Sequence, residues 1–117
     1  MRLACAAVLA ACLTGQAAFA HAVLERAIPA VGAELAAPPT AVTLVFSEAI
    51  EVAFSSVAVT DADGRRVDQQ TLRTENDGTV LVAPLPTLPP GVYEVAWRVT
   101  SVDTHRTQGH FRFTIGR

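Results

Sequence analysis

Apolar and polar residues alternate with a period of two along most of the chain after residue 20. The alternation is clearest over 42–46, 93–99 and 111–115, where every second residue is large and apolar. Such segments predict strands with one buried face, and turn-forming residues separate them at intervals of about ten residues. No segment shows the 3.6-residue period of a helix. The pattern predicts one all-β domain, an antiparallel sandwich or barrel of about seven strands.

Turn sequences mark the boundaries of these strands. Asp63-Gly64 and Asp77-Gly78 carry the Asp-Gly pair that favours a tight hairpin turn. The proline-rich stretch 84–91 predicts a connection between strands, because proline cannot donate a hydrogen bond to a central ladder.

The first twenty residues have a different character. Arg2 is followed by an apolar run from Leu3 to Leu13 and then by small residues ending at Ala20. This is the order of a secretory signal peptide, and the run is too short to span a bilayer comfortably. We expect residues 1–20 to be removed and 21–117 to form the domain. Two alternatives are a buried N-terminal helix and lipoprotein-type cleavage before Cys12.

Composition excludes several classes of function. The 117 residues carry nine Lys or Arg and eleven Asp or Glu, a formal net charge of -2. Without clustered cations a nucleic-acid partner is not expected. Both cysteines and the one methionine lie within residues 1–20, so the domain would have no disulfide and no sulfur ligand for a metal. No later apolar segment has membrane length, and we expect a monomer that is not inserted in a membrane.

Cleavage after Ala20 would give His21 an unusual chemistry. An N-terminal histidine offers its α-amine and its ring to one metal ion, and both nitrogens lose their protons near neutral pH. Asp103 and His105 form an Asp-x-His at the end of the strand predicted from Tyr93 onward. If the strand pleat persists, the two side chains share one face about 6.6 Å apart. Alternatively, His21 is accidental and Asp103 and His105 form an ion pair in a loop.

Together these residues would give three nitrogens and one oxygen, a set that suits Cu(II), with Zn(II) or Ni(II) as competitors. Glu48 is either a solvated loop acid or an acceptor that orients His21. His110 has the opposite parity to the apolar residues that follow it, so it should face outward, away from the metal.

Several motifs of residues 21–117 resemble the CopC family of periplasmic copper-binding, copper-resistance proteins. In chain order these motifs are His21-Ala22-Val23-Leu24, Pro29-Ala30-Val31-Gly32-Ala33, Phe46-Ser47-Glu48, Phe54-Ser55-Ser56-Val57, Asp61-Ala62-Asp63-Gly64, Gly91-Val92-Tyr93-Glu94-Val95-Ala96-Trp97-Arg98-Val99 and Asp103-Thr104-His105. The resemblance implies an Ig-like or cupredoxin-like Greek-key β-sandwich. It also implies a Cu(II) site formed by His21, Asp103 and His105, with Glu48 as an outer partner.

The chain departs from the family pattern around the Asp-x-His. Thr104 stands where Gly is frequent and Arg106 where Pro is frequent, and the methionines of a Cu(I) site are missing. The resemblance therefore implies a Cu(II)-only, non-enzymatic periplasmic carrier or buffer in copper homeostasis and resistance. A CopD-type inner-membrane copper transporter would be its partner. The alternatives are a secreted Ig-like structural module without metal and a copper oxidase with a histidine brace.

Overall fold

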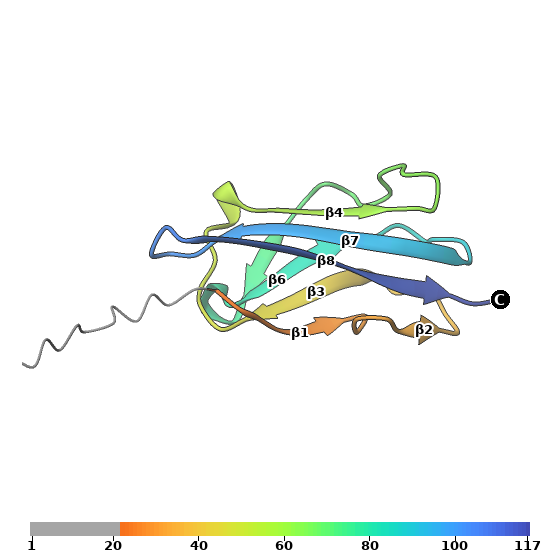
Figure 1. The fold of residues 1–117 in the computed structure, drawn as a ribbon, viewed down its shortest axis with the longest axis horizontal. Helices are drawn as coiled ribbons and strands as arrows, with labels where there is room; N and C mark the ends of the chain where they lie inside the picture. The colour runs from red at the N-terminus through yellow and green to blue at the C-terminus, as the bar shows by residue number, and fades with distance from the viewer. Residues whose placement is uncertain (1–21) are drawn as a thin grey trace, which may run out of the picture.

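Eight strands form two four-stranded sheets that lie face to face (Figure 1). The structure is a computed structural model that describes residues 22–117, so the predicted signal peptide and His21 lie outside the described residues. The strands are β1 (Leu24–Ile28), β2 (Glu34–Leu35), β3 (Ala41–Phe46), β4 (Ser56–Thr60), β5 (Arg73–Glu75), β6 (Val80–Pro84), β7 (Gly91–Thr100) and β8 (Arg106–Ile115). Two short 3-10 turns are η1 (Val52–Phe54) and η2 (Asn76–Gly78).

The predicted all-β sandwich is confirmed, with two differences in detail. One sheet has the order β1-β3-β6-β5 and the other β2-β8-β7-β4. Residues 22–117 form eight strands rather than about seven, and the two-residue β2 pairs with β8 in parallel, whereas an antiparallel arrangement was expected. All other strand pairs within the described residues are antiparallel.

The core consists of the residues that the alternation placed inward. Val42, Leu44 and Phe46 of β3 are buried, and the residues between them are half-buried. Phe111 and Phe113 of β8 show the same alternation from the facing sheet. Burial of alternate apolar side chains from both sheets is the main force holding a sandwich without disulfides together.

Both predicted Asp-Gly turns are present, with different consequences. Gly78 has a φ of +88° and ends η2, which joins β5 to β6 as a hairpin. Gly64, with a φ of +79°, ends a turn after β4. The chain that follows it forms an isolated bridge between Thr60 and Arg66 rather than another strand.

This returning segment covers the outer edge of β4. The backbone N–H of Val67 donates to the carbonyl of Val59 at 2.8 Å. The Asp68 carboxylate, whose side chain is 2 % exposed, accepts from the backbone N–H of Val59 at 2.9 Å. Arg66 donates to the same carboxylate at 2.8 Å and to the carbonyl of Val57 at 3.2 Å. Side-chain groups therefore take the place of a further strand along β4.

Trp97 of β7 lies across Gly109 of β8, its partner in the register. Its indole meets Phe46 edge to face, with ring centroids 5.3 Å apart. A Cβ atom built on Gly109 would lie 2.6 Å from Trp97 Cζ2, far inside van der Waals contact. The position needs glycine for space rather than for its backbone conformation.

We therefore expect Gly109→Ala to destabilise the domain by about 2 kcal/mol, because the indole must leave its position against Phe46. Urea unfolding followed by the fluorescence of the chain's single tryptophan measures the effect. Gly116→Ala is the matched control, since its Cβ would meet only the Leu35 carbonyl oxygen at 3.5 Å. Equal stability of the two variants would contradict this account of Trp97.

Among residues 22–117 no helix has the length and apolar character needed to cross a lipid bilayer.

Candidate metal centre

Asp103 and His105 lie in the tight loop that joins β7 to β8, at one end of the sandwich (Figure 1). The backbone N–H of Ser101 donates to the His105 carbonyl at 2.9 Å, and the N–H of Thr104 donates to the Ser101 carbonyl at 2.8 Å. These bonds close the loop directly after Thr100, the last residue of β7.

The structure therefore corrects the expectation that the strand pleat runs on through Asp103 and His105. Thr100 and Ser101 are both buried although they are consecutive, so the alternation ends there. The turn brings the carboxylate and the imidazole together: Asp103 Oδ1 lies 3.2 Å from His105 Nδ1. This is the ion-pair geometry of the loop alternative, and it also places two metal-ligating groups side by side.

Thr104, between these two residues, has a φ of +73°. This left-handed conformation favours glycine, and a residue with a Cβ atom adopts it only at a cost in free energy. The Thr104 hydroxyl donates to the carbonyl oxygen of Asp103 at 2.5 Å. The loop thus keeps a conformation suited to glycine even though the residue here is threonine.

The Asp103 carboxylate is charged at neutral pH and accessible. A hydrogen bond from the Ser101 hydroxyl is the largest cause that lowers the pKa of Asp103, and hydrogen bonds and charge from His105 lower it further. The side chains of Asp103 and His105 are 38 % and 34 % exposed. A charged oxygen and an imidazole at an open end of the fold are groups that a metal ion can reach.

The first described residues are fixed beside this loop. Ala22 is 1 % exposed, and its carbonyl accepts a hydrogen bond from the Thr107 hydroxyl at 2.9 Å. Thr107 follows His105 by two residues on β8. The Val23 N–H donates to the Ser47 hydroxyl at 2.9 Å, and the Ser47 N–H donates to the Val23 carbonyl at 2.9 Å. The start of the described chain and the Asp103–His105 loop therefore meet at one end of the sandwich.

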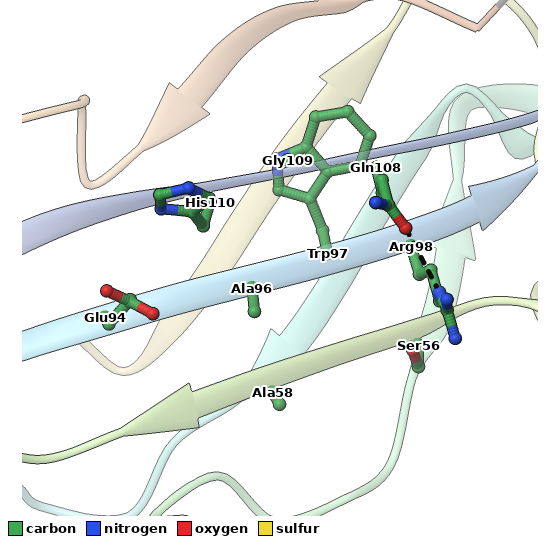
Figure 2. A pocket seen from close by; sticks show the side chains of 9 residues that line it. All are labelled: Ser56, Ala58, Glu94, Ala96, Trp97, Arg98, Gln108, Gly109 and His110. Atoms are coloured by element: carbon green, nitrogen blue, oxygen red, sulfur yellow. Dashed lines mark hydrogen bonds between the residues drawn. The ribbon is translucent and has the colours of Figure 1, made fainter. Parts of the chain in front are cut away.

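Glu48 and His110 have different surroundings. Glu48 is half-buried and directly follows Ser47, which holds the N-terminal strand. His110 is exposed on the outer face of the sheet that contains β4, β7 and β8, which confirms its predicted direction. There it lines an open hollow of about 460 Å³ with Glu94 and Arg98 at its rim and alanines in its floor (Figure 2). Neither Asp103 nor His105 lines this hollow.

Within residues 22–117, no three His, Cys, Asp or Glu side chains are close enough to hold a metal ion between them. The structure brings Asp103 and His105 together but adds neither Glu48 nor His110 to them. His21 lies outside the described residues, so its place as a ligand stays a prediction. Ser101, which hydrogen-bonds Asp103, was missed, and the only signal in the sequence was a serine two residues before the aspartate.

Comparison with known proteins adds independent evidence. The CopC domain family matches residues 24–116. Protein YobA of Escherichia coli K12 is 40 % identical over 113 residues, which cover 93 % of this chain and 90 % of YobA.

Two solved structures share the fold. CopC from Methylosinus trichosporium OB3b superimposes with a TM-score of 0.77 at 33 % identity, covering 82 % of this chain and 94 % of that one. PcoC, a methionine-rich copper resistance protein from Escherichia coli, superimposes with a TM-score of 0.71 at 30 % identity, covering 82 % and 99 %. With its two-sheet sandwich and its family match over nearly all of the described residues, the chain belongs to the CopC family of non-enzymatic copper-binding proteins associated with copper resistance.

Proposed function

We propose that the chain is a periplasmic carrier or buffer that binds one Cu(II) ion and releases it, in copper homeostasis and resistance. The observation that carries this proposal is the Asp103–His105 pair beside the anchored start of the described chain at Ala22. Function of this kind is binding and release without catalysis.

The ligands we propose are the α-amine and imidazole of His21, the Asp103 carboxylate and the His105 imidazole. The Thr107 hydroxyl holds the carbonyl of Ala22, the residue that follows His21 in the sequence, beside the Asp103–His105 loop. Removal of residues 1–20 would free the amine. Glu48, directly after the serine that binds Val23, is our candidate for an acceptor that orients His21.

The donor set favours Cu(II) over Cu(I). Three nitrogens and one carboxylate oxygen suit Cu(II), whereas Cu(I) prefers thiolate and thioether ligands. Residues 21–117 contain no cysteine and no methionine, in contrast to the methionine-rich PcoC. We therefore propose a Cu(II)-only member of the family.

Two changes would release the ion from such a site. Reduction to Cu(I) leaves the metal with ligands that hold it poorly. Acid protonates the amine and both imidazoles, so affinity falls as pH falls. We propose a CopD-type inner-membrane copper transporter as the partner that receives or supplies the ion, on the basis of family membership.

The test is a Cu(II) titration of the domain 21–117, with EPR spectra of the loaded protein. We expect one ion per chain and a tetragonal, nitrogen-rich spectrum. His105→Ala should lower the Cu(II) affinity by about 100-fold or more. The substitution removes a proposed metal ligand itself, which costs more than removing a residue that only hydrogen-bonds a ligand. His110→Ala is the matched control and should change nothing, since His110 lies on the outer face of the sheet. Weak binding that is equal in all three proteins would favour a structural module without metal.

A further inference from the structure

Ser101 is a fully buried polar residue two positions before Asp103. It directly follows β7 and forms an isolated antiparallel β-bridge with Ile50, so its backbone is held in place. A buried hydroxyl costs free energy unless it is hydrogen-bonded. Its partners therefore indicate what the side chain does.

The Ser101 hydroxyl has two acceptors within reach. One is Oδ1 of Asp103, and the other is the His105 carbonyl oxygen at 3.3 Å. A hydroxyl has one hydrogen to donate, and the charged carboxylate is the stronger acceptor, so it receives that hydrogen. The His105 carbonyl already accepts the Ser101 backbone N–H at 2.9 Å. The hydroxyl is thus committed to Asp103.

We propose that Ser101 is a positioning residue of the copper site: its hydroxyl fixes the Asp103 carboxylate beside the His105 imidazole before the metal arrives. This inference rests on the proposed function. The loop backbone adds one longer hydrogen bond, from the His105 N–H to Asp103 Oδ1 at 3.4 Å, so the Ser101 hydroxyl is the main group that orients this 38 % exposed side chain. Ligands oriented in advance lose less conformational freedom on binding, which raises affinity.

The test compares two substitutions of Ser101 by Cu(II) titration and EPR. Ser101→Ala should lower Cu(II) affinity by about tenfold, a typical loss for removing a support of a metal ligand. Its EPR spectrum should shift toward that of Asp103→Ala. Ser101→Thr keeps the hydroxyl, so it should keep the affinity and the spectrum, although its added methyl group in a fully buried position lowers the Tm.

Ser55→Ala is the matched control at the same end of the sandwich. The Ser55 hydroxyl donates to the Glu51 carbonyl at 2.8 Å and accepts from the Thr100 N–H at 3.1 Å. It has the same chemistry as Ser101 but holds backbone instead of Asp103. We expect a lower Tm with unchanged Cu(II) affinity and EPR spectrum.

The outcomes separate this inference from the proposed function. If the unmodified domain binds Cu(II) tightly and Ser101→Ala binds it equally well, the inference is overturned and the copper site stands. Equal losses in Ser101→Ala and Ser55→Ala, or in Ser101→Ala and Ser101→Thr, also overturn it, because they indicate general loosening. If the unmodified domain binds no Cu(II), the proposed function fails and the inference fails with it.

Discussion

A domain that begins at His21 should bind Cu(II) at least 100-fold more tightly than the same domain with one additional residue before His21. The extra peptide bond converts the α-amine into an amide, whose nitrogen binds a metal only after it has lost a proton. The chelate between amine and ring is then lost, which should cost more than the 10–100-fold typical of changes around a ligand. Competition titration measures the loss, and EPR should show fewer nitrogens around the ion.

An extension after Arg117 provides the control for the added residue. The C-terminus lies at the opposite end of the sandwich from the Asp103–His105 loop (Figure 1), so this extension should leave Cu(II) affinity unchanged. A cleavable N-terminal extension should regain full affinity once it is removed. Equal affinity with and without the residue before His21 would exclude the N-terminal chelate and favour a structural module.

Asp68→Ala should destabilise the domain by about 3 kcal/mol, or lower its Tm by about 15 °C. The substitution removes the carboxylate that accepts hydrogen bonds from the N–H groups of Val59 and Gln70. It also removes the ion pair to Arg66. The Arg66 side chain is 41 % exposed and regains water, which keeps the loss below that of a fully buried pair. Thermal and urea unfolding at neutral pH measure it.

Glu75→Ala is the matched control, because Arg73 and Glu75 form a pair with the same spacing at 3.3 Å. Both side chains are more than half exposed, so the loss should stay below about 1 kcal/mol. A loss for Asp68→Ala no larger than for Glu75→Ala would show that the covered edge of β4 contributes little stability.

The stability of the same edge should depend on pH in a predictable direction. Burial raises the pKa of the Asp68 carboxyl, but hydrogen bonds from Arg66 and the Val59 N–H lower it by more, so the net change is downward. A lowered pKa in the folded state stabilises above the unfolded value of about 3.9, and this contribution disappears as pH falls through the folded value. Asp68→Ala should therefore lose less stability than the unmodified domain as pH falls below about 5.

The long strands could be predicted from the sequence because each buries one face. Val42, Leu44 and Phe46 alternate with less buried residues in the structure as they do in the pattern. The short strands β2 and β5 could not be predicted, since Glu34–Leu35 has two residues and Arg73–Glu75 three, mostly polar. Such strands form because a neighbouring strand offers hydrogen bonds, which a local pattern does not reveal.

The candidate site was partly predictable. Residue chemistry pointed to Asp103 and His105, and the outward direction of His110 followed from parity. Their mutual geometry was predicted from a pleat that ends at Thr100, so the reason given for their proximity was wrong. The support from Ser101 depends on a loop conformation in which Thr104 adopts a positive φ, and no spacing rule indicates that choice.

The covered edge of β4 also determines how copies of this domain meet one another. An open strand edge invites another chain to add a strand, and the hazard grows with concentration. The Arg66 guanidinium occupies the Val57 carbonyl, and the Asp68 carboxylate and the Val67 N–H occupy the N–H and carbonyl of Val59, so another copy finds these positions already taken. The ion pair that stabilises one molecule thus also blocks part of a strand edge at which two copies could otherwise pair.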